Sequence, residues 1–165
     1  EEIDRYAKYN YADNTWDIGS LSRTAWVDFG LHSKPRAAGV AESLNYIYSH
    51  ETGTTDDGSA MEPFIESSVF SIGDGEQFSF ISRLIPDIDI ASSEATTSVN
   101  YVLKSRNFPG ESLSTNSTSA VTSTTDQAFV RSRSRSTVLR VESSASDIQW
   151  TLGDLRLDIR PDGRR

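Results

Sequence analysis

Four arginines near the C-terminus form the densest set of side chains that could bind a charged partner: Arg131, Arg133, Arg135 and Arg140. The first three recur at every second position, so they would project from one face of a β-strand. Guanidinium groups held so close repel one another unless acids or phosphates lie opposite. Those anions could come from this chain (Glu142 or Asp158), from a neighbouring subunit or from DNA in a channel. We favour a ladder that faces a partner within an assembly.

Side chains for catalysis or metal binding are sparse. A Ser–His–Asp catalytic site would need one of the two histidines, His32 or His50, beside a nucleophilic serine, and the serines are too numerous for one to be singled out. Both histidines are therefore interpreted as surface loop residues. The acidic runs 56–57 and 74–76 lack the spacing of a calcium loop, and the Asp74-Gly75 pair is first of all a turn former. Cysteine is absent, which excludes disulfides and thiolate zinc sites. We expect no enzymatic activity, no metal and no cofactor.

The three tryptophans, Trp16, Trp26 and Trp150, fall within strand-like patterns flanked by apolar residues. This context favours packing in a core. The alternative is a surface groove of aromatic side chains that binds sugars, as in carbohydrate-binding modules.

The elements that would hold these residues are predicted to be strands, because apolar residues recur at every second position and no stretch has a convincing helical period. The predicted strands are residues 6–11, 15–18, 24–29, 44–48, 64–72, 77–85, 97–106, 129–135, 138–141, 148–152 and 155–160. Segments 64–72 and 77–85 flank Asp74-Gly75 and are predicted to pair as a hairpin. The fold class is therefore all-β, with essentially no helix.

Two polar or Gly/Pro-containing segments are predicted to be connections. Residues 32–40 contain proline and glycine and follow the strand at 24–29. Ten of the fourteen residues from Ser112 to Thr125 are serine or threonine. Such a segment buries little apolar surface, so residues 111–125 are predicted to form a projecting loop.

The charge is unevenly distributed along the chain. The net charge of −8 argues against a general nucleic-acid-binding protein. From Asp126 to Arg165, eight arginines face six acids, a balance of +2, whereas the other 125 residues carry −10. The last 40 residues are therefore the local candidate for an anionic partner. No apolar run is long enough for a membrane span, and the first residues lack a signal-peptide layout and suggest an excised fragment.

Several sequence blocks resemble the C-terminal region of nozzle, or packaged-DNA stabilisation, proteins of short-tailed bacteriophages (podoviruses). The blocks span most of the chain: residues 9–16 (YNYADNTW), 72–78 (IGDGEQF), 104–110 (KSRNFPG), 129–135 (FVRSRSR) and 149–165 (QWTLGDLRLDIRPDGRR). Such proteins often end in an Arg-x-Arg strand, a Trp-x-Leu-Gly strand and a terminal Asp-Gly-Arg-Arg. They are several times longer than this chain.

The resemblance implies a homo-oligomeric ring at the tip of a phage tail, in contact with adjacent tail proteins. The protein would be made in the host cytoplasm and would reside in the virion. The family carries a β-propeller and accessory β-domains, rings the DNA channel and holds the genome until ejection. It implies no catalytic residues to transfer, and non-specific contact with packaged DNA is a further expectation.

We therefore predict two parts. Residues 1–60 would be propeller-type strands at the end of a larger region, and residues 61–165 would form a β-sandwich. The expected function is structural, in tail assembly, channel closure and genome ejection. The alternative is a viral carbohydrate-binding β-sandwich for host attachment.

Overall fold

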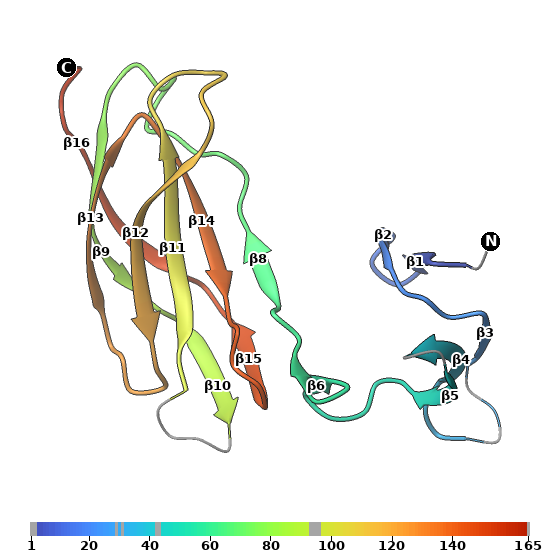
Figure 1. Ribbon diagram of the computed structural model, residues 1–165. Coiled ribbons are helices and arrows are strands. Elements are labelled where there is room, and N and C mark those ends of the chain that lie inside the picture. The colour runs from blue at the N-terminus through green and yellow to red at the C-terminus, as the bar shows by residue number, and fades with distance from the viewer. Residues whose placement is uncertain (1–2, 29, 31, 42–43, 93–96, 165) are drawn as a thin grey trace. The chain divides into compact units, whose positions relative to one another are not determined.

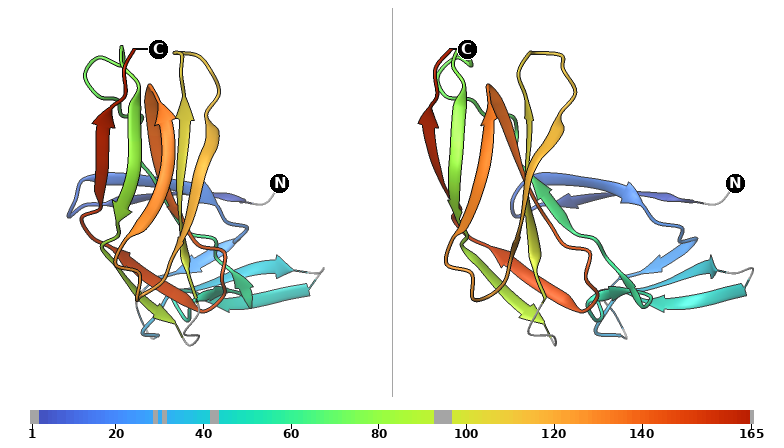
Figure 2. Two further views of the ribbon diagram at one scale, coloured as in Figure 1. Left: turned by 90° about the vertical axis from the view of Figure 1, so that its left-hand side faces the viewer. Right: turned by 60° about the vertical axis from the view of Figure 1, so that its left-hand side comes forward.

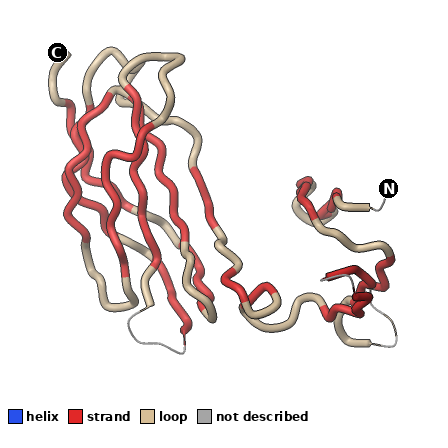
Figure 3. The backbone as a smooth tube through the Cα atoms, viewed as in Figure 1, coloured by secondary structure: helices blue, strands red, loops and turns tan. Residues whose placement is uncertain are grey.

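The computed structural model describes residues 3–28, 30, 32–41, 44–92 and 97–164. Within these residues the chain is all-β, with strands β1 to β16 and no helix (Figures 1 and 3). The predicted all-β class is confirmed, and each of these strands pairs with at least one other strand. The chain divides into two compact units, Glu1–Gly53 (unit 1) and Thr54–Arg165 (unit 2).

Unit 1 consists of a hairpin and a three-stranded antiparallel sheet. Strands β1 (Arg5–Asn10) and β2 (Thr15–Ser20) form the hairpin, whose turn places Asn14 in the left-handed region at φ 54°. Asparagine tolerates this conformation better than most residues. The sheet has the order β3-β4-β5, with β3 Ala25–Val27, β4 Arg36–Ala41 and β5 Leu44–Ser49. The described residues of unit 1 form no closed propeller.

The prediction of a connection at residues 32–40 is wrong, because β4 is the central strand of that sheet. Alanine and glycine are weak strand formers, so the segment containing Ala37, Ala38 and Gly39 gives little local signal. The small side chains allow close approach. A Cβ atom at Gly39 would lie 2.8 Å from the carbonyl oxygen of Ser22.

Unit 2 contains the remaining strands. They are β6 Thr55–Asp56, β7 Ser59–Ala60, β8 Phe64–Glu66, β9 Ser79–Ile85, β10 Ile88–Ser92, β11 Val99–Arg106, β12 Ser114–Val121, β13 Ala128–Ser134, β14 Ser136–Glu142, β15 Ile148–Leu152 and β16 Arg156–Pro161. One sheet has the order β12-β11-β14-β8 and another β13-β9-β16, while β6 pairs with β7 and β10 with β15. The two larger sheets form separate groups of strands in Figures 1 and 2.

The two larger sheets of unit 2 share one hydrophobic core. Ile81 and Leu84 of β9 and Tyr101 and Leu103 of β11 are fully buried and belong to one cluster with Val141 of β14. The predicted alternation along β11 is confirmed, since Val99, Tyr101 and Leu103 all point into the core. Strand β13 alternates buried and exposed residues along its whole length.

The core also has a polar part. Buried hydroxyls replace apolar side chains where β13 meets β14: Ser134 and Thr137 lie 2.9 Å apart, and the Ser79 hydroxyl donates to the Ser134 carbonyl at 2.9 Å. Asn116 reaches from β12 to donate to the Ser132 hydroxyl at 2.9 Å. These pairings satisfy groups whose burial would otherwise be costly.

The predicted hairpin around Asp74-Gly75 is wrong. Residues 73–76 do turn, with Gly73 at φ 60° and Gly75 at φ 79°. However, β8 pairs with β14 in the four-stranded sheet, whereas β9 pairs with β13 and β16 in the other. The turn therefore carries the chain from one sheet to the other. The period of the flanking segments shows that each has a buried face but not which strand lies beside it.

The prediction of a projecting Ser/Thr-rich loop at residues 111–125 is also wrong. Residues 114–121 form β12, which pairs with β11 along its length, with a register shift at Leu103 and Lys104. Strand β12 needs little apolar surface of its own because it lies at the sheet edge and is anchored by the buried Val121. Threonine also favours strands.

Candidate functional site: an arginine face on unit 2

The register of β13, β9 and β16 gathers arginines on the outer face of the three-stranded sheet. Because side chains alternate between faces, the residues opposite the core point outward together. Across the strands, Arg133 lies beside Phe80, which lies beside Arg160. We call this surface the arginine face. Its residues are Phe78, Phe80, Arg83, Phe129, Arg131, Arg133, Arg135, Arg156, Asp158, Arg160 and Asp162. Six arginines and two aspartates give it a net charge of +4.

Two of the predicted arginines are held around one phenylalanine. The Arg133 guanidinium lies 4.0 Å from the centre of the Phe78 ring, and that of Arg135 lies 4.8 Å from it. Arg133 pairs with Asp162 at 2.5 Å and also donates to its carbonyl at 3.1 Å. Arg135 donates to the carbonyls of Glu76 at 2.6 Å and Arg164 at 3.0 Å. These contacts hold both guanidinium groups in place. They also offset the electrostatic repulsion expected between neighbouring arginines of the row.

A third arginine on this face is also paired. Arg83 pairs with Asp158 at 2.5 Å and donates to Gln127 at 3.0 Å. Asp158 was one of the two acids proposed from the sequence to offset the row, but it lies opposite Arg83 in the sheet.

The remaining arginines of the face have no ion pair within the described part of the chain. They are Arg131, Arg156 and Arg160, all exposed. Arg160 lies over the Phe80 ring at 4.8 Å. Beside them Phe129 is 76% exposed. The face therefore offers three uncompensated charges and one apolar side chain to a partner.

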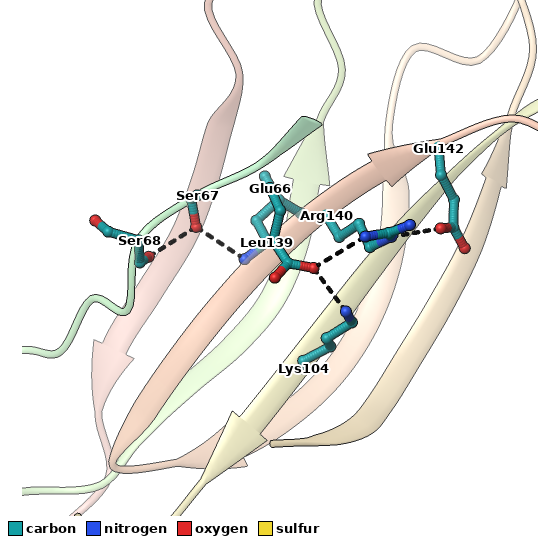
Figure 4. A network of polar contacts seen from close by, with 7 residues as sticks. All are labelled: Glu66, Ser67, Ser68, Lys104, Leu139, Arg140 and Glu142. Carbon is teal, nitrogen blue, oxygen red and sulfur yellow. Dashed lines mark hydrogen bonds and ion pairs between the residues drawn. The ribbon is translucent and has the colours of Figure 1, made fainter. Parts of the chain in front are cut away.

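Arg140, the fourth predicted arginine, lies on the outer face of the other sheet. It pairs with Glu142 at 2.5 Å and with Glu66 at 3.3 Å, and its guanidinium lies 3.7 Å from the centre of the Phe64 ring. Figure 4 shows Lys104 joining the same network through Glu66, at 2.6 Å. The hydrogen bond from Lys104, followed by that from Arg140, lowers the pKa of Glu66. This cluster ties β8 to β14 and β11 and borders a shallow pocket that also includes Asn100 and Ser143.

The chain itself thus supplies acids to two of the four predicted arginines and carbonyl groups to a third. Glu142, the other acid proposed from the sequence, does pair with one of them. Sequence reasoning missed Asp162, Glu66 and Phe78. Period-two spacing, extended one residue before β9 and one residue beyond β16, could have placed Phe78 and Asp162 on the outward face. The contact of Glu66 with Arg140 could not be predicted in this way, because it depends on which strand pairs with β14.

The tryptophans do not all lie in a core as predicted. Trp16 in β2 is 71% exposed, with its ring 4.7 Å from that of Tyr9, and Trp26 in β3 is 48% exposed. The core prediction is wrong for these two, because unit 1 has almost no buried interior to receive them. Trp150 is half-buried against the core of unit 2, and its indole N–H donates to Ser143 at 3.0 Å.

The described residues contain no group of three or more metal-ligating side chains. His32 is exposed, whereas His50 is half-buried. Its Nε2 accepts a hydrogen bond from Arg23 at 3.2 Å, and its ring lies 4.7 Å from that of Trp26. Asp57 and Gly58 form the turn between β6 and β7, and both have positive φ. A helix long and apolar enough to cross a membrane is not found among the described residues.

Comparison with known proteins does not identify a family for this chain. No protein-family model matches the chain, and no curated protein matches it either.

Proposed function

We propose that the chain is a structural subunit of a larger assembly, in which the exposed apolar side chains of unit 1 are buried against a neighbouring copy. The observation that carries this proposal is the exposure of unit 1. Among its described residues, Ala37 is the one buried hydrophobic residue, while twelve large hydrophobic side chains are exposed. Soluble monomers rarely expose so many apolar side chains in so short a segment.

The assembly proposed is the nozzle of a short bacteriophage tail, where the chain would help to close the DNA channel and take part in tail assembly and genome ejection. The similarity of the five sequence blocks to nozzle proteins supports this identity. The expected propeller-type setting of residues 1–60 would supply neighbouring strands for the exposed faces, and the two larger sheets with their shared core would form the β-sandwich domain.

Two exposed isoleucines in unit 1, Ile18 and Ile47, provide a direct test. They are 79% and 77% exposed. Their double replacement by serine should weaken self-association measured by analytical ultracentrifugation, because each loses apolar area at the contact. Phe108→Ser in unit 2, at a side chain that is 67% exposed, is the matched control and should change nothing.

Electron cryo-microscopy of the assembly supplies the second part of the test. The proposal requires both isoleucines to be buried against another subunit in a ring around a channel. A chain that is monomeric and leaves them in solvent would overturn it.

The second candidate function is carbohydrate binding for host attachment. The exposed Trp16 and its neighbour Tyr9 favour it, because aromatic faces stack on sugar rings. A glycan array decides between the two functions. Binding that is lost in Trp16→Ala would favour the carbohydrate-binding module, whereas an array without any bound glycan would remove it.

A further inference from the structure

Most acids of unit 2 lie outside the arginine face. The arginine face carries +4, whereas the other residues of unit 2 contain five basic and fourteen acidic side chains, a balance of −9. A body with charges divided in this way presents complementary surfaces to copies of itself.

From this separation we infer that the arginine face docks on the acidic remainder of unit 2 in a second copy of the chain. The contact is heterologous, because two different surfaces meet, and it therefore leads to a closed ring or an open chain of subunits. The inference rests on the proposed function for the existence of an assembly, and it names the surface and the partner for one contact within it.

The side chains of the face suit a protein partner. Arg133 and Arg135 are fixed by Asp162, by backbone carbonyls and by the Phe78 ring, so they lose little freedom on binding. The exposed Phe129 supplies an apolar anchor beside the uncompensated Arg131. Arginine and aromatic side chains are the residues enriched at the centres of protein interfaces.

A nucleic-acid backbone fits the same face less well. Asp158 in β16 and Asp162 just after it place negative charge within the positive surface. Of the six arginines on the face, only Arg83 and Arg133 pair with an acid among the described residues, and Arg135 donates to backbone carbonyls. The net charge of −8 on the whole chain also repels a polyanion.

The test reverses the three arginines of the face that have neither an ion pair nor a hydrogen bond among the described residues, Arg131, Arg156 and Arg160, so that the contacts that hold the fold stay intact. We expect the wild-type full chain to associate at low salt and to dissociate as salt screens the contact. The triple variant Arg131→Glu, Arg156→Glu and Arg160→Glu should associate at least about tenfold more weakly in analytical ultracentrifugation. The triple glutamine variant guards against misfolding caused by the new acids and should show an intermediate loss.

A matched control variant has the same change in net charge, made at three basic residues outside the arginine face. Arg5, Lys8 and Arg36 in unit 1 are exposed and have no ion pair within the described residues. Their reversal to glutamate should leave the slope of association against salt concentration unchanged, because the contact proposed for unit 1 is apolar and is not screened by salt. A general charge effect would weaken the control and the test variant equally, and that result would overturn the inference.

The heterologous geometry gives a second readout. A copy with a reversed arginine face still presents its acidic surface, so it should cap wild-type chains and shorten their assemblies when the two are mixed. If the variant does not cap wild-type chains, the contact is not heterologous and the inference fails.

Two further outcomes separate this inference from its alternatives. If the chain stays monomeric at low salt and instead binds a labelled DNA duplex through the three arginines, the partner is nucleic acid and the inference is wrong. If the Ile18 and Ile47 variant abolishes association while the arginine variants leave it intact, the proposed function stands and the inference about the arginine face fails.

Discussion

Units 1 and 2 are both built from antiparallel strands, yet they differ in what those strands enclose. Of the thirteen buried hydrophobic residues described, twelve lie in unit 2 and one in unit 1. In unit 2 buried side chains from both larger sheets belong to one core, so strands β9, β11, β13 and β14 bury apolar residues within the chain. Unit 1 has a hairpin and one small sheet, and its aromatic side chains remain in solvent. The same period-two pattern thus produces a unit with a buried interior in one case and a unit with almost none in the other.

The charged side chains differ in the same way. In unit 2, ion pairs and cation–π contacts hold Arg83, Arg133 and Arg140 on the sheet surfaces. In unit 1, one cation–π contact is found among the described residues, with Arg23 lying 3.7 Å from the centre of the Tyr48 ring. Stability is therefore expected to depend on the interior and surface pairs in unit 2, and on association in unit 1.

The largest expected effect comes from removing core volume. Ile81→Ala, at a fully buried side chain of β9, should lower the free energy of unfolding by about 3 kcal/mol because it leaves a cavity. Ile18→Ala in unit 1 should cost less than about 0.5 kcal/mol in the unassociated chain, since its side chain is 79% exposed. Urea unfolding followed by circular dichroism measures both. Equal losses would contradict the contrast between the units.

The next effect depends on alkaline pH. The Tyr101 hydroxyl is buried without a hydrogen-bond partner, and burial, followed by the negative charge of Asp87, raises its pKa to about 12. In the unfolded chain it ionises near its ordinary pKa, so stability is lost as pH rises from 10 towards 12, by about 2 kcal/mol at pH 11.5. Tyr101→Phe should remove this part of the alkaline loss. A pH series of thermal unfolding from 8 to 11.5 tests it, and parallel curves for the two proteins would refute the assignment.

A smaller effect should follow from a methyl group at Gly153. Its Cβ atom would lie 2.5 Å from Asp87 Oδ2, and the same oxygen accepts the N–H of Asp154 at 3.0 Å. Gly153→Ala should therefore displace the carboxylate and cost about 1 kcal/mol, the value of a typical hydrogen bond. Gly30→Ala in unit 1, where a Cβ atom meets nothing within 4 Å, is the control and should be neutral. Chemical denaturation of both variants would show no difference if the Asp87 contact were unimportant.

The smallest effect concerns the cluster around Glu66. Because the pKa of Glu66 is lowered by Lys104 and Arg140, its contribution is present above its ordinary pKa of 4.5 and is lost as pH falls below that value. Glu66→Gln should lower the Tm of unit 2 by about 2 °C at pH 7, since exposed pairs contribute little, and by less at pH 3. Calorimetry at the two pH values measures the difference. A Tm decrease as large at pH 3 as at pH 7 would show that packing rather than charge is involved.

Local features of the structure were largely predictable from the sequence. Alternation along 97–106 and 129–135 correctly put Tyr101 on the same face as Leu103, and Arg133 on the same face as the other arginines of its row, because side-chain direction in a strand is a property of the backbone. The hairpin at β1 and β2 followed from its turn residues. Segments with weak or polar signals were misjudged: β4 is made of small residues, and β12 of serine and threonine. In both, neighbouring strands supply the hydrogen bonds and the buried surface that the segments themselves lack.

The sequence by itself determined the all-β class, the alternating faces of the strands in unit 2 and the grouping of Arg131, Arg133 and Arg135 on one face. Only the tertiary structure decided that β8 and β9 belong to different sheets, that Arg140 lies on the opposite sheet from the other three, and that Asp162 and Phe78 meet Arg133. It also decided that Trp16 and Trp26 are exposed. The physical reason is that side-chain direction is local, whereas strand pairing and burial depend on contacts between segments far apart in the chain.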